Sequence, residues 1–400
     1  MTIAAEGPPA EPPFRITMLW RDDRYRSGFI QVVTLMLVML AASWLVSNAI
    51  TNLSNQGKNF DFGFLWQPAN YDINQRLIEY DSRDTNARAA LVGILNTLLV
   101  ALMGCITATV VGVFVGVLRL SKNWLIAKLM TVFVEIFRNV PVLIWILLVA
   151  AVVNESLPSP RAFRGVDTGA IVATNRGLYV PAPVLGDYAG IVIAVFLAAI
   201  AAVIALRVYA RKRQAATGEQ LPVLWLSLAI LIVPTGLVYF AAGSPITLEY
   251  PELKGFNFRG GTFMRDSLIA LWIALSLYTA AFIAEIVRAG ILSVSHGQTE
   301  AAFALGLRPN RTMNLIILPQ ALRVIIPPLI SQFLNLTKNS SLAIAVGYMD
   351  ATGTLGGITL NQTGREMECI LLLMAFYLIV SLAISAAMNV YNSRVKLVER

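Results

Sequence analysis

Charge is scarce in this sequence. Asp, Glu, Lys and Arg make up only 14% of the 400 residues, whereas a soluble domain usually carries about a quarter of such residues. Hydrophobic residues make up 57%, and the mean hydropathy is +0.68. This balance excludes an ordinary soluble domain and predicts a chain that lies mostly in a lipid bilayer.

Metal-ligating and redox-active residues are equally few. The one histidine, His296, leaves no second histidine for a zinc site, and it borders a polar stretch where a solvated position is expected. The two cysteines, Cys105 and Cys369, lie inside apolar runs, where we expect them to act as small buried hydrophobes. No disulfide framework and no bound metal are therefore predicted.

Motifs for catalysis are also missing. The sequence contains no GxxxxGK(S/T) phosphate loop, no nucleophile elbow and no H-E-x-x-H pattern. We therefore do not expect the chain to be an enzyme, to hydrolyse ATP or to bind a cofactor of its own. An ATP-driven process would need ATP and Mg²⁺ in a separate subunit.

Long apolar runs are what the sequence has instead. Each is near the roughly 20 residues that a helix needs to cross a bilayer, and helices satisfy their own backbone hydrogen bonds in lipid. We therefore predict an all-α integral membrane protein with about eight transmembrane helices. The predicted spans cover residues 28–50, 89–118, 129–153, 189–206, 223–242, 265–287, 321–346 and 366–390.

Lys and Arg residues predict the orientation of these spans. They cluster in short loops, for example at Arg119 and Lys122 and at Arg207 and Arg211, which places both termini in the cytoplasm. The net charge of +8 follows from this bias, so no nucleic-acid partner is implied. A basic flank before residues 28–50 could also belong to a signal peptide, but no small-x-small cleavage site follows, and a retained first helix is favoured.

Two spans are unusual in composition. Residues 89–118 are rich in Gly, Ala and Thr, and because small residues let membrane helices approach closely, this span is predicted to lie inside the bundle. Residues 321–346 contain Pro327 and Pro328 and then the polar stretch 338–341. This span is predicted to be broken or bent.

A polar stretch, GQTEAAFALGLRPNRTMNLIILP, lies between two apolar segments at Gly297–Pro319. Its polarity places it outside the bilayer, as a short helix, a turn and a second apolar run that ends at Leu318-Pro319. Gly306 is expected to end the first helix in the left-handed conformation. The fixed positions of the pattern are Gly297, Glu300, Ala301, Ala302, Gly306, Leu318 and Pro319.

This spacing resembles the EAA loop of the membrane subunits of ABC importers, the cytoplasmic element that docks into the ATPase. The resemblance implies that these positions couple the chain to an ATPase, with Ala301 and Ala302 allowing close approach. The alternative is an ordinary loop between membrane helices, in which Glu300 and Gly306 only cap a helix. The full spacing with its Leu-Pro ending favours the coupling function.

Three further segments, residues 135–146, 278–291 and 319–342, resemble the polar amino-acid family of these permeases. The resemblance is strongest over 265–391 and extends to 89–153, which implies a type I importer (MetI-like) core in two parts. The longer layout resembles the larger permease subunit of the general L-amino-acid importers of Gram-negative bacteria.

The resemblance also implies how the rest of the chain is organised. Residues 1–27 and 392–400 would be cytoplasmic tails, 28–50 an extra first helix, 51–88 a periplasmic loop, 154–264 an insertion with two extra transmembrane helices, and 289–320 the coupling loop.

The implied complex lies in the bacterial inner membrane. It would contain this chain, a second permease that makes a heterodimer, ATPase subunits that bind ATP and Mg²⁺, and a periplasmic amino-acid-binding protein. The chain would form the pathway for L-amino acids across the lipid bilayer.

Charged and polar residues near the spans are candidates for that pathway. They are Glu285, Arg288, Arg138, Lys338 and Asn339. Charges at membrane depth are costly and usually face a partner or a cavity, and helical neighbours three apart, such as Glu285 and Arg288 or Glu135 and Arg138, can pair. Two alternatives stay open: the arginines could snorkel to the interface, and Lys338 could bond to backbone carbonyls freed by a helix break.

An ion-driven secondary transporter of amino acids is the alternative function. It would need acidic residues in mid-membrane to bind sodium or protons, but Glu285 and Glu135 are predicted to lie near the inner face. A membrane-bound assembly protein would leave the EAA-like stretch without a role. The sequence therefore favours ATP-driven import.

Overall fold

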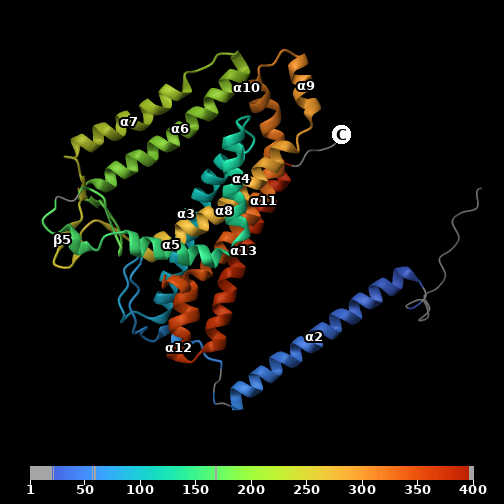
Figure 1. Cartoon of the computed structure of the whole chain (residues 1–400), viewed down its shortest axis with the longest axis vertical. Helices are drawn as coiled ribbons and strands as arrows, with labels where there is room; N and C mark the ends of the chain where they lie inside the picture. Colours follow the sequence, from blue (N-terminus) through green and yellow to red (C-terminus); the bar gives the residue numbers. More distant parts are fainter. Residues whose placement is uncertain (1–19, 21, 56, 58–59, 167–168, 396–400) are drawn as a thin grey trace, which may run out of the picture. The chain divides into compact units, whose positions relative to one another are not determined.

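The computed structural model describes residues 20, 22–55, 57, 60–166 and 169–395 (Figure 1). The chain divides into two units, Met1–Phe62 and Gly63–Arg400, and each is considered by itself. The first unit contains helix α2 (Asp23–Asn55), which includes the first predicted span. Most of the predicted N-terminal tail, and residues 396–400 of the predicted C-terminal tail, lie outside the described residues.

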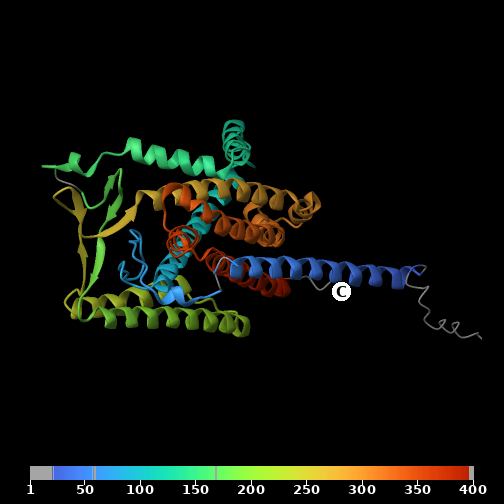
Figure 2. The same cartoon turned by 90° about the horizontal axis from the view of Figure 1, so that it is seen from below.

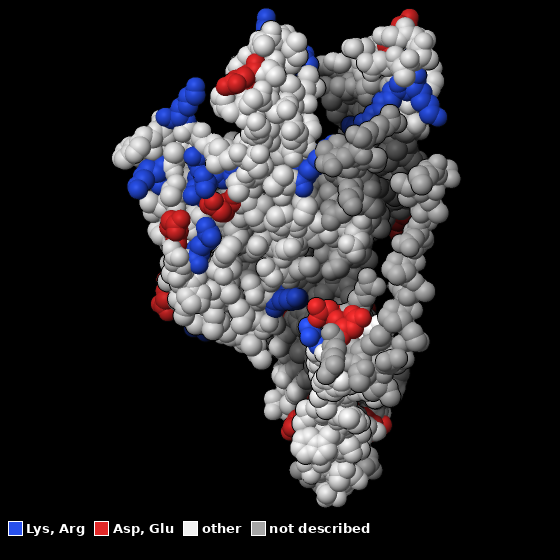
Figure 3. Space-filling model, turned by 90° about the vertical axis from the view of Figure 1, so that its right-hand side faces the viewer, with Lys and Arg blue, Asp and Glu red and all other residues white. Residues whose placement is uncertain are grey.

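Within the described residues, eight helical segments are long and apolar enough to cross a membrane, as the sequence predicted. The helices that form them are α2, α3 (Asn86–Leu118), α5 (Val142–Ser156), α6 (Ala189–Thr217), α7 (Val223–Ala241), α8 (Asp266–Leu292), α11 (Leu318–Asn339) and α13 (Glu366–Val395). Figure 3 shows a face of the molecule on which charged side chains are few and separated by broad uncharged areas. The mostly helical membrane fold is confirmed.

The single span predicted at 129–153 is wrong, because two helices meet there. α4 (Trp124–Asn139) and α5 are separated at Pro141, which has no N–H for the helix ladder and disfavours helical geometry at Val140 before it. α6 also continues beyond its predicted end at residue 206, so the basic residues that were expected in a loop lie on its last turns. It ends at Gly218, which has a φ of 75°.

Residues 154–188 and 243–264, which flank the two extra helices of the predicted insertion, contain short antiparallel strands. One sheet has the order β1-β2-β7, and two further pairs join β3 with β4 and β5 with β6. The strands are β1 (Val172–Thr174), β2 (Gly177–Val180), β3 (Ala182–Leu185), β4 (Ile246–Glu249), β5 (Glu252–Lys254), β6 (Asn257–Arg259) and β7 (Thr262–Arg265). Tyr179 pairs with Phe263 across β2 and β7, and their rings stack at 4.6 Å between centroids. Figure 2 shows the strands gathered at one end of α6, α7 and α8.

α8 lies at the centre of the helical core, where α3, α4, α5 and α11 pack against it. Two glycines of α3 let the two backbones come close. A Cβ atom on Gly112 would lie 2.6 Å from Ile283, and one on Gly116 would lie 2.7 Å from the carbonyl oxygen of Ala284. The prediction that the small-residue span lies in the interior is therefore confirmed.

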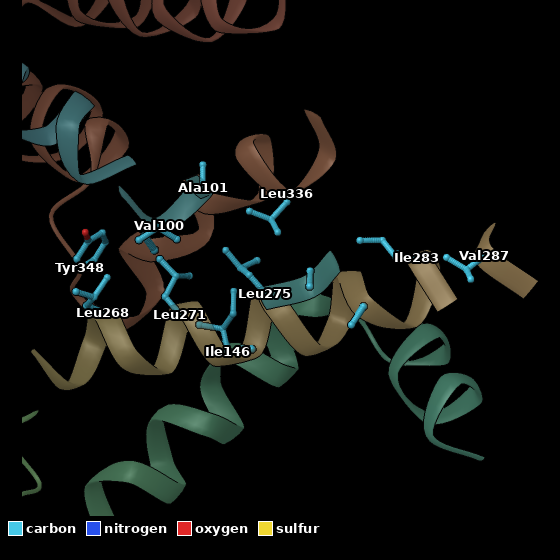
Figure 4. Packing of buried hydrophobic residues seen from close by; sticks show 14 of the residues in the cluster. Val100, Ala101, Ile146, Leu268, Leu271, Leu275, Ile283, Val287, Leu336 and Tyr348 are labelled. Carbon is cyan, nitrogen blue, oxygen red and sulfur yellow. The ribbon is translucent and has the colours of Figure 1, made fainter. Parts of the chain in front are cut away.

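Apolar side chains fill the space around α8 (Figure 4). The cluster joins Val100 of α3, Ile146 of α5, Leu275 of α8 and Leu336 of α11, all of them fully buried. Because lipid is as apolar as these side chains, close packing rather than removal from water holds such a core together in a membrane.

The predicted bend of the 321–346 span occurs at its polar stretch 338–341 and not at its prolines. Pro327 and Pro328 lie inside α11, which stays α-helical to Asn339. A 3₁₀ helix, η4 (Ser340–Val346), follows and ends at Gly347, which has a φ of 68°.

Polar contacts fix the end of the core at which α3 begins. The loop before α3, which includes the 3₁₀ helix η1 (Gly63–Trp66), meets the segment that holds the π-helix η5 (Thr352–Thr359) and α12 (Leu360–Thr363). The hydroxyls of Tyr71 and Thr359 are 2.9 Å apart. Asn96 donates to the carbonyl oxygens of Gln75, at 2.6 Å, and Met349, at 2.8 Å. Asn96 thus joins three segments that are far apart in the sequence.

Candidate functional site

The EAA-like stretch folds as a short helix after the end of α8. This helix, α9 (His296–Ala304), is followed by Gly306 in the left-handed region, with a φ of 75°, as predicted. The N–H of Leu307 donates to the carbonyl of Ala302 at 3.1 Å, and the N–H of Gly306 donates to that of Phe303 at 2.9 Å. These bonds satisfy the carbonyls at the helix end.

One side of α9 is packed and the other is exposed. Ala302 is buried, and α9 contacts the next helix, α10 (Pro309–Thr312), whereas Gly297, Glu300 and Ala301 are exposed. The Glu300 carboxylate lies 3.0 Å from Nδ1 of His296 in the first turn, with both side chains largely in solvent. The solvated position predicted for His296 is confirmed.

Large apolar side chains also project from α9 and its end, and the sequence analysis did not single them out. Phe303 is 50% exposed and Leu305 is 80% exposed. Both lie outside the segments that could span a membrane. Exposed apolar surface of this kind, beside polar residues, commonly marks a protein interface.

Leu318 and Pro319, where the apolar run of the EAA-like stretch ends, lie inside a continuous helical segment. α10, the π-helix η3 (Met313–Ile317) and α11 follow one another without a break. Pro319 offers no N–H to the carbonyl four residues before it, that of Leu315, and the wider π turn lies directly ahead of the proline. The helix therefore passes through the Leu-Pro pair and connects the region beside α9 to the membrane core.

A single carboxylate gathers three arginines on the turns of α8 that lead to α9. Glu285 accepts hydrogen bonds from Arg288, at 2.8 Å, and from Arg119 at the end of α3, and Arg138 of α4 lies 3.8 Å away. The Arg119 side chain is only 8% exposed. With one anion among three cations, the cluster keeps a surplus of positive charge.

The predicted pairing of Glu135 with Arg138 is wrong. The Glu135 carboxylate accepts a hydrogen bond from Asn139 at 3.2 Å. Arg138 turns to Glu285 instead, and its guanidinium lies 5.4 Å from the centre of the Phe282 ring. Spacing along α4 alone did not show that a carboxylate on another helix was nearer.

The pairing of Glu285 with Arg288 is confirmed, but a second hydrogen-bond donor to Glu285, Arg119, was missed. Arg119 had been interpreted only as a marker of a cytoplasmic turn. It lies 166 residues from Glu285 in the sequence, so no local pattern could have joined the two.

A cleft of about 250 Å³ opens between α8 and α11. It is lined by Tyr278, Thr279 and Phe282 of α8 and by Gln332, Asn335, Lys338 and Asn339 of α11. Lys338 is the one charged residue of the lining, and the amides and hydroxyls around it offer both donors and acceptors. Phe282 belongs to this lining and to the contact with Arg138, so the cleft adjoins the arginine cluster.

Lys338 and Asn339 form the last turn of α11. The carbonyl of Lys338 accepts a hydrogen bond from the Ser341 hydroxyl at 2.8 Å, and that of Thr337 accepts one from the Ser340 hydroxyl at 2.7 Å. Within the part of the chain that the structure describes, the Lys338 ammonium has neither an ion pair nor a hydrogen bond. Serine hydroxyls, and not the lysine, therefore bind the carbonyls freed at the helix break.

A buried acid, Asp350, was missed by the sequence analysis. It is fully buried and lies outside the segments that could span a membrane. Its Oδ1 atom accepts the N–H of Gly353 at 2.8 Å, while Oδ2 has no hydrogen-bond partner. Burial raises the pKa of this carboxyl from 3.8 to about 6. The sequence signal was an acid in a glycine-rich segment, but its burial depends on the turn around Gly347.

Metal ligation has no candidate among the described residues, because no group of three or more His, Cys, Asp or Glu side chains is placed to hold an ion.

Comparison with known proteins gives one family model and several full-length relatives. The model of the family described as "Binding-protein-dependent transport system inner membrane component" matches residues 215–397. The chain is 51% identical, over its full length and that of the relative, to the glutamate/glutamine/aspartate/asparagine transport system permease protein BztB of Rhodobacter capsulatus. It is 45% identical to the general L-amino acid transport system permease protein AapQ of Rhizobium johnstonii, over 95% of this chain and 94% of that one. It is 46% identical to the putative amino-acid ABC transporter permease protein YhdX of Escherichia coli, over 96% and 98%.

Replacing Glu285 with Gln is expected to lower the free energy of unfolding by about 1–3 kcal/mol, because three guanidinium groups would lose their shared anion. Glu135→Gln is the matched control and should change it by less than about 0.5 kcal/mol, since Glu135 has only an amide partner. Thermal unfolding of both purified variants in one detergent measures the difference. Equal effects of the two substitutions would contradict the role given to Glu285.

Asp350→Asn is expected to remove a pH dependence of stability. The folded chain holds the Asp350 proton more tightly than the unfolded chain, so the native protein loses stability as pH rises from the ordinary pKa of 3.8 through about 6. Asn can still accept the Gly353 N–H and stays neutral, so the variant should be more stable than the native chain above about pH 6. Unfolding midpoints of both proteins across this pH range test the prediction, which fails if their difference is constant.

Proposed function

Because the chain belongs to the family of inner membrane components of binding-protein-dependent transport systems, we propose that it is the translocation subunit of an ATP-driven importer of L-amino acids. The observation that carries the proposal is the exposed, EAA-like helix α9, which directly follows α8, the helix that forms the centre of the core and one wall of a polar cleft. Full-length relatives whose names include amino-acid transport support the substrate class.

The coupling surface for the ATPase is α9 with its exposed residues Glu300, Ala301, Phe303 and Leu305. A small alanine permits close approach of a partner, and the two large apolar side chains supply the buried contact that an interface needs. Gly306 ends the helix, so the surface is short and can fit into a cleft of the partner. ATP and Mg²⁺ would act in that partner and not in this chain.

The cleft between α8 and α11 is the proposed amino-acid site. The free Lys338 ammonium suits a substrate carboxylate, and the side-chain oxygens of Gln332, Asn335 and Asn339 suit its ammonium group. Since the lining contains no acid, a neutral or acidic side chain is favoured over a basic one. Arg138 and Arg288 adjoin the cleft and extend its positive charge toward α9.

We infer the remaining partners from the family. A periplasmic amino-acid-binding protein would deliver substrate to the outside loops, and a second permease, in a heterodimer, would complete the pathway. Both termini would be cytoplasmic in the inner membrane. The two permeases would alternate between inward-open and outward-open states around the site.

An ion-driven carrier remains the rival function, and Asp350 is its only new support. Its buried carboxyl could hold a proton, but Oδ1 already accepts the backbone N–H of Gly353. That contact is typical of a turn, and it favours a structural role for Asp350 over an ion-coupling one.

Glu300→Arg is expected to abolish ATPase co-purification and to lower amino-acid uptake by at least tenfold. The reason is that a reversed charge in the interface with the ATPase costs on the order of several kcal/mol of binding free energy. Radiolabelled amino-acid uptake in cells, with membrane levels checked, measures the effect. Asp23→Arg, at an exposed acid in the first turn of α2, is the matched charge reversal and should leave both unchanged. Uptake that persists in Glu300→Arg and survives ATP depletion would favour the ion-driven carrier.

Lys338→Met is expected to raise the KM for uptake by roughly tenfold or more, because a charged hydrogen bond to the substrate carboxylate would be lost. Met keeps the length of the apolar stem, and ATPase co-purification should not change. Lys128→Met, on the exposed part of α4, removes an equal charge away from the cleft and serves as control. An unchanged KM in Lys338→Met would exclude a carboxylate contact at this residue.

A further inference from the structure

α6 and α7 form a hairpin whose helices pack mainly against each other. At the end where α6 leads into α7, a cleft of about 410 Å³ lies between the last turns of α6 and the returning chain. Its lining includes Arg207, Ala210, Arg211 and Gln214 of α6 and Gln220 of the return. This cleft belongs to neither α9 nor the cleft beside α8.

The charges in this cleft are arranged on one face. Arg207, Arg211 and Gln214 are four and then three residues apart, so they share a side of the helix, and the buried Ala210 lies between them as a small residue in the lining. Arg213 instead forms an ion pair with Glu219 at 2.7 Å, which closes the turn.

Within the described residues, neither Arg207 nor Arg211 has an ion pair. Both guanidinium groups are therefore available to a ligand. Gln214 and Gln220 add neutral donors beside them. The chemistry of this site fits a phosphate or another compact anion with several oxygen atoms.

The depth of the cleft matches the edge of a bilayer. Arg207 follows Ala189 by about 18 residues, or about 27 Å of helix, and α7 has 19 residues, or about 28 Å. The hydrocarbon core of a bilayer is about 30 Å thick. The arginines are therefore separated from the start of α6 by about one hydrocarbon thickness, which is the depth expected of the phosphates of one leaflet.

Exposed apolar side chains lie close in sequence to the residues that line the cleft. Ile204 is 59% exposed and Val208 50% on α6, and Leu224 is 67% exposed and Trp225 72% on α7. Such side chains can pack against acyl chains, and a Trp at this depth is typical of a membrane interface. Positive charge and exposed apolar surface thus occur together. A phospholipid needs both, one for its phosphate and one for its acyl chains, whereas a free anion needs only the charge.

We propose that Arg207 and Arg211 bind the phosphate of an anionic phospholipid of the inner leaflet, with its acyl chains along the exposed apolar side of α6 and α7. The assignment to the inner leaflet rests on the proposed function, in which this end of the hairpin is cytoplasmic; the binding itself does not. Basic residues that only set the orientation of a membrane helix need neither a common helix face nor a cleft. Lys212, next to Arg211, contributes to that orientation signal without lining the cleft.

The test measures lipid that stays bound. The purified full chain is reconstituted in phosphatidylcholine nanodiscs that contain a minor share of phosphatidylglycerol, returned to detergent, and analysed for both lipids by native mass spectrometry. Native protein should retain phosphatidylglycerol preferentially. The double variant Arg207→Gln, Arg211→Gln should lower this preference by about tenfold or more, since each basic residue near the surface contributes to anionic-lipid binding.

The matched control is the double variant Lys122→Gln, Lys212→Gln, which removes the same charge from exposed residues that do not line the cleft. It should keep the native preference. Equal loss in both double variants would overturn the proposal in favour of general attraction, and so would displacement of phosphatidylglycerol by inorganic phosphate at millimolar concentration.

Gln214→Glu provides a second route if the arginine variant does not fold. It places a carboxylate in the cleft and should also weaken the preference, whereas an unchanged preference would overturn the proposal. The measurement reports bound lipid and not uptake, so its failure leaves the proposed transport function untouched.

Discussion

The close contact of α3 with α8 is the constraint on which the rest of the core depends. At Gly112 and Gly116 no side chain separates the two helices, and α8 can therefore be enclosed by its neighbours. The same approach brings Arg119, at the end of α3, to Glu285 on α8. A buried guanidinium is tolerated there only because its anion is within hydrogen-bond distance. Packing of small residues thus fixes the geometry of the charged cluster.

The two candidate sites are connected through the same two helices, α8 and α11. α9 follows α8 directly, and Gln298 of α9 lies 3.4 Å from Gln320 of α11. Gly290 of α8 also packs against Ile325 of α11, so these helices are in firm contact near α9. Farther along, the cleft lies between the same two helices. α9 is therefore connected to both of the helices that line the cleft, which is the contiguous contact that coupling between the two candidate sites requires.

The sequence predicted features that depend on local patterns. Hydrophobic length gave the spans, the left-handed Gly306 ended its helix, and Glu285 paired with Arg288. It did not predict features that depend on distant partners. Arg138 lies beside Glu285 of α8 and does not pair with Glu135 of its own helix. The spacing of residues along α4 contains no information on which helix packs against α4. The pairs β2 with β7 and β3 with β4 were missed for the same reason, since each joins segments from either side of α6 and α7.

The position of Lys338 illustrates how fold and site constrain each other. A cation without a partner is costly within a membrane protein. The end of α11 lowers that cost, because the negative end of the helix dipole lies at the last turn, and the change to a 3₁₀ helix places it beside amides rather than lipid. Ser340 and Ser341 bind the carbonyls there, which leaves the ammonium unengaged. The helix break itself requires only the two serine hydroxyls, so the unpaired ammonium is consistent with the proposed carboxylate site.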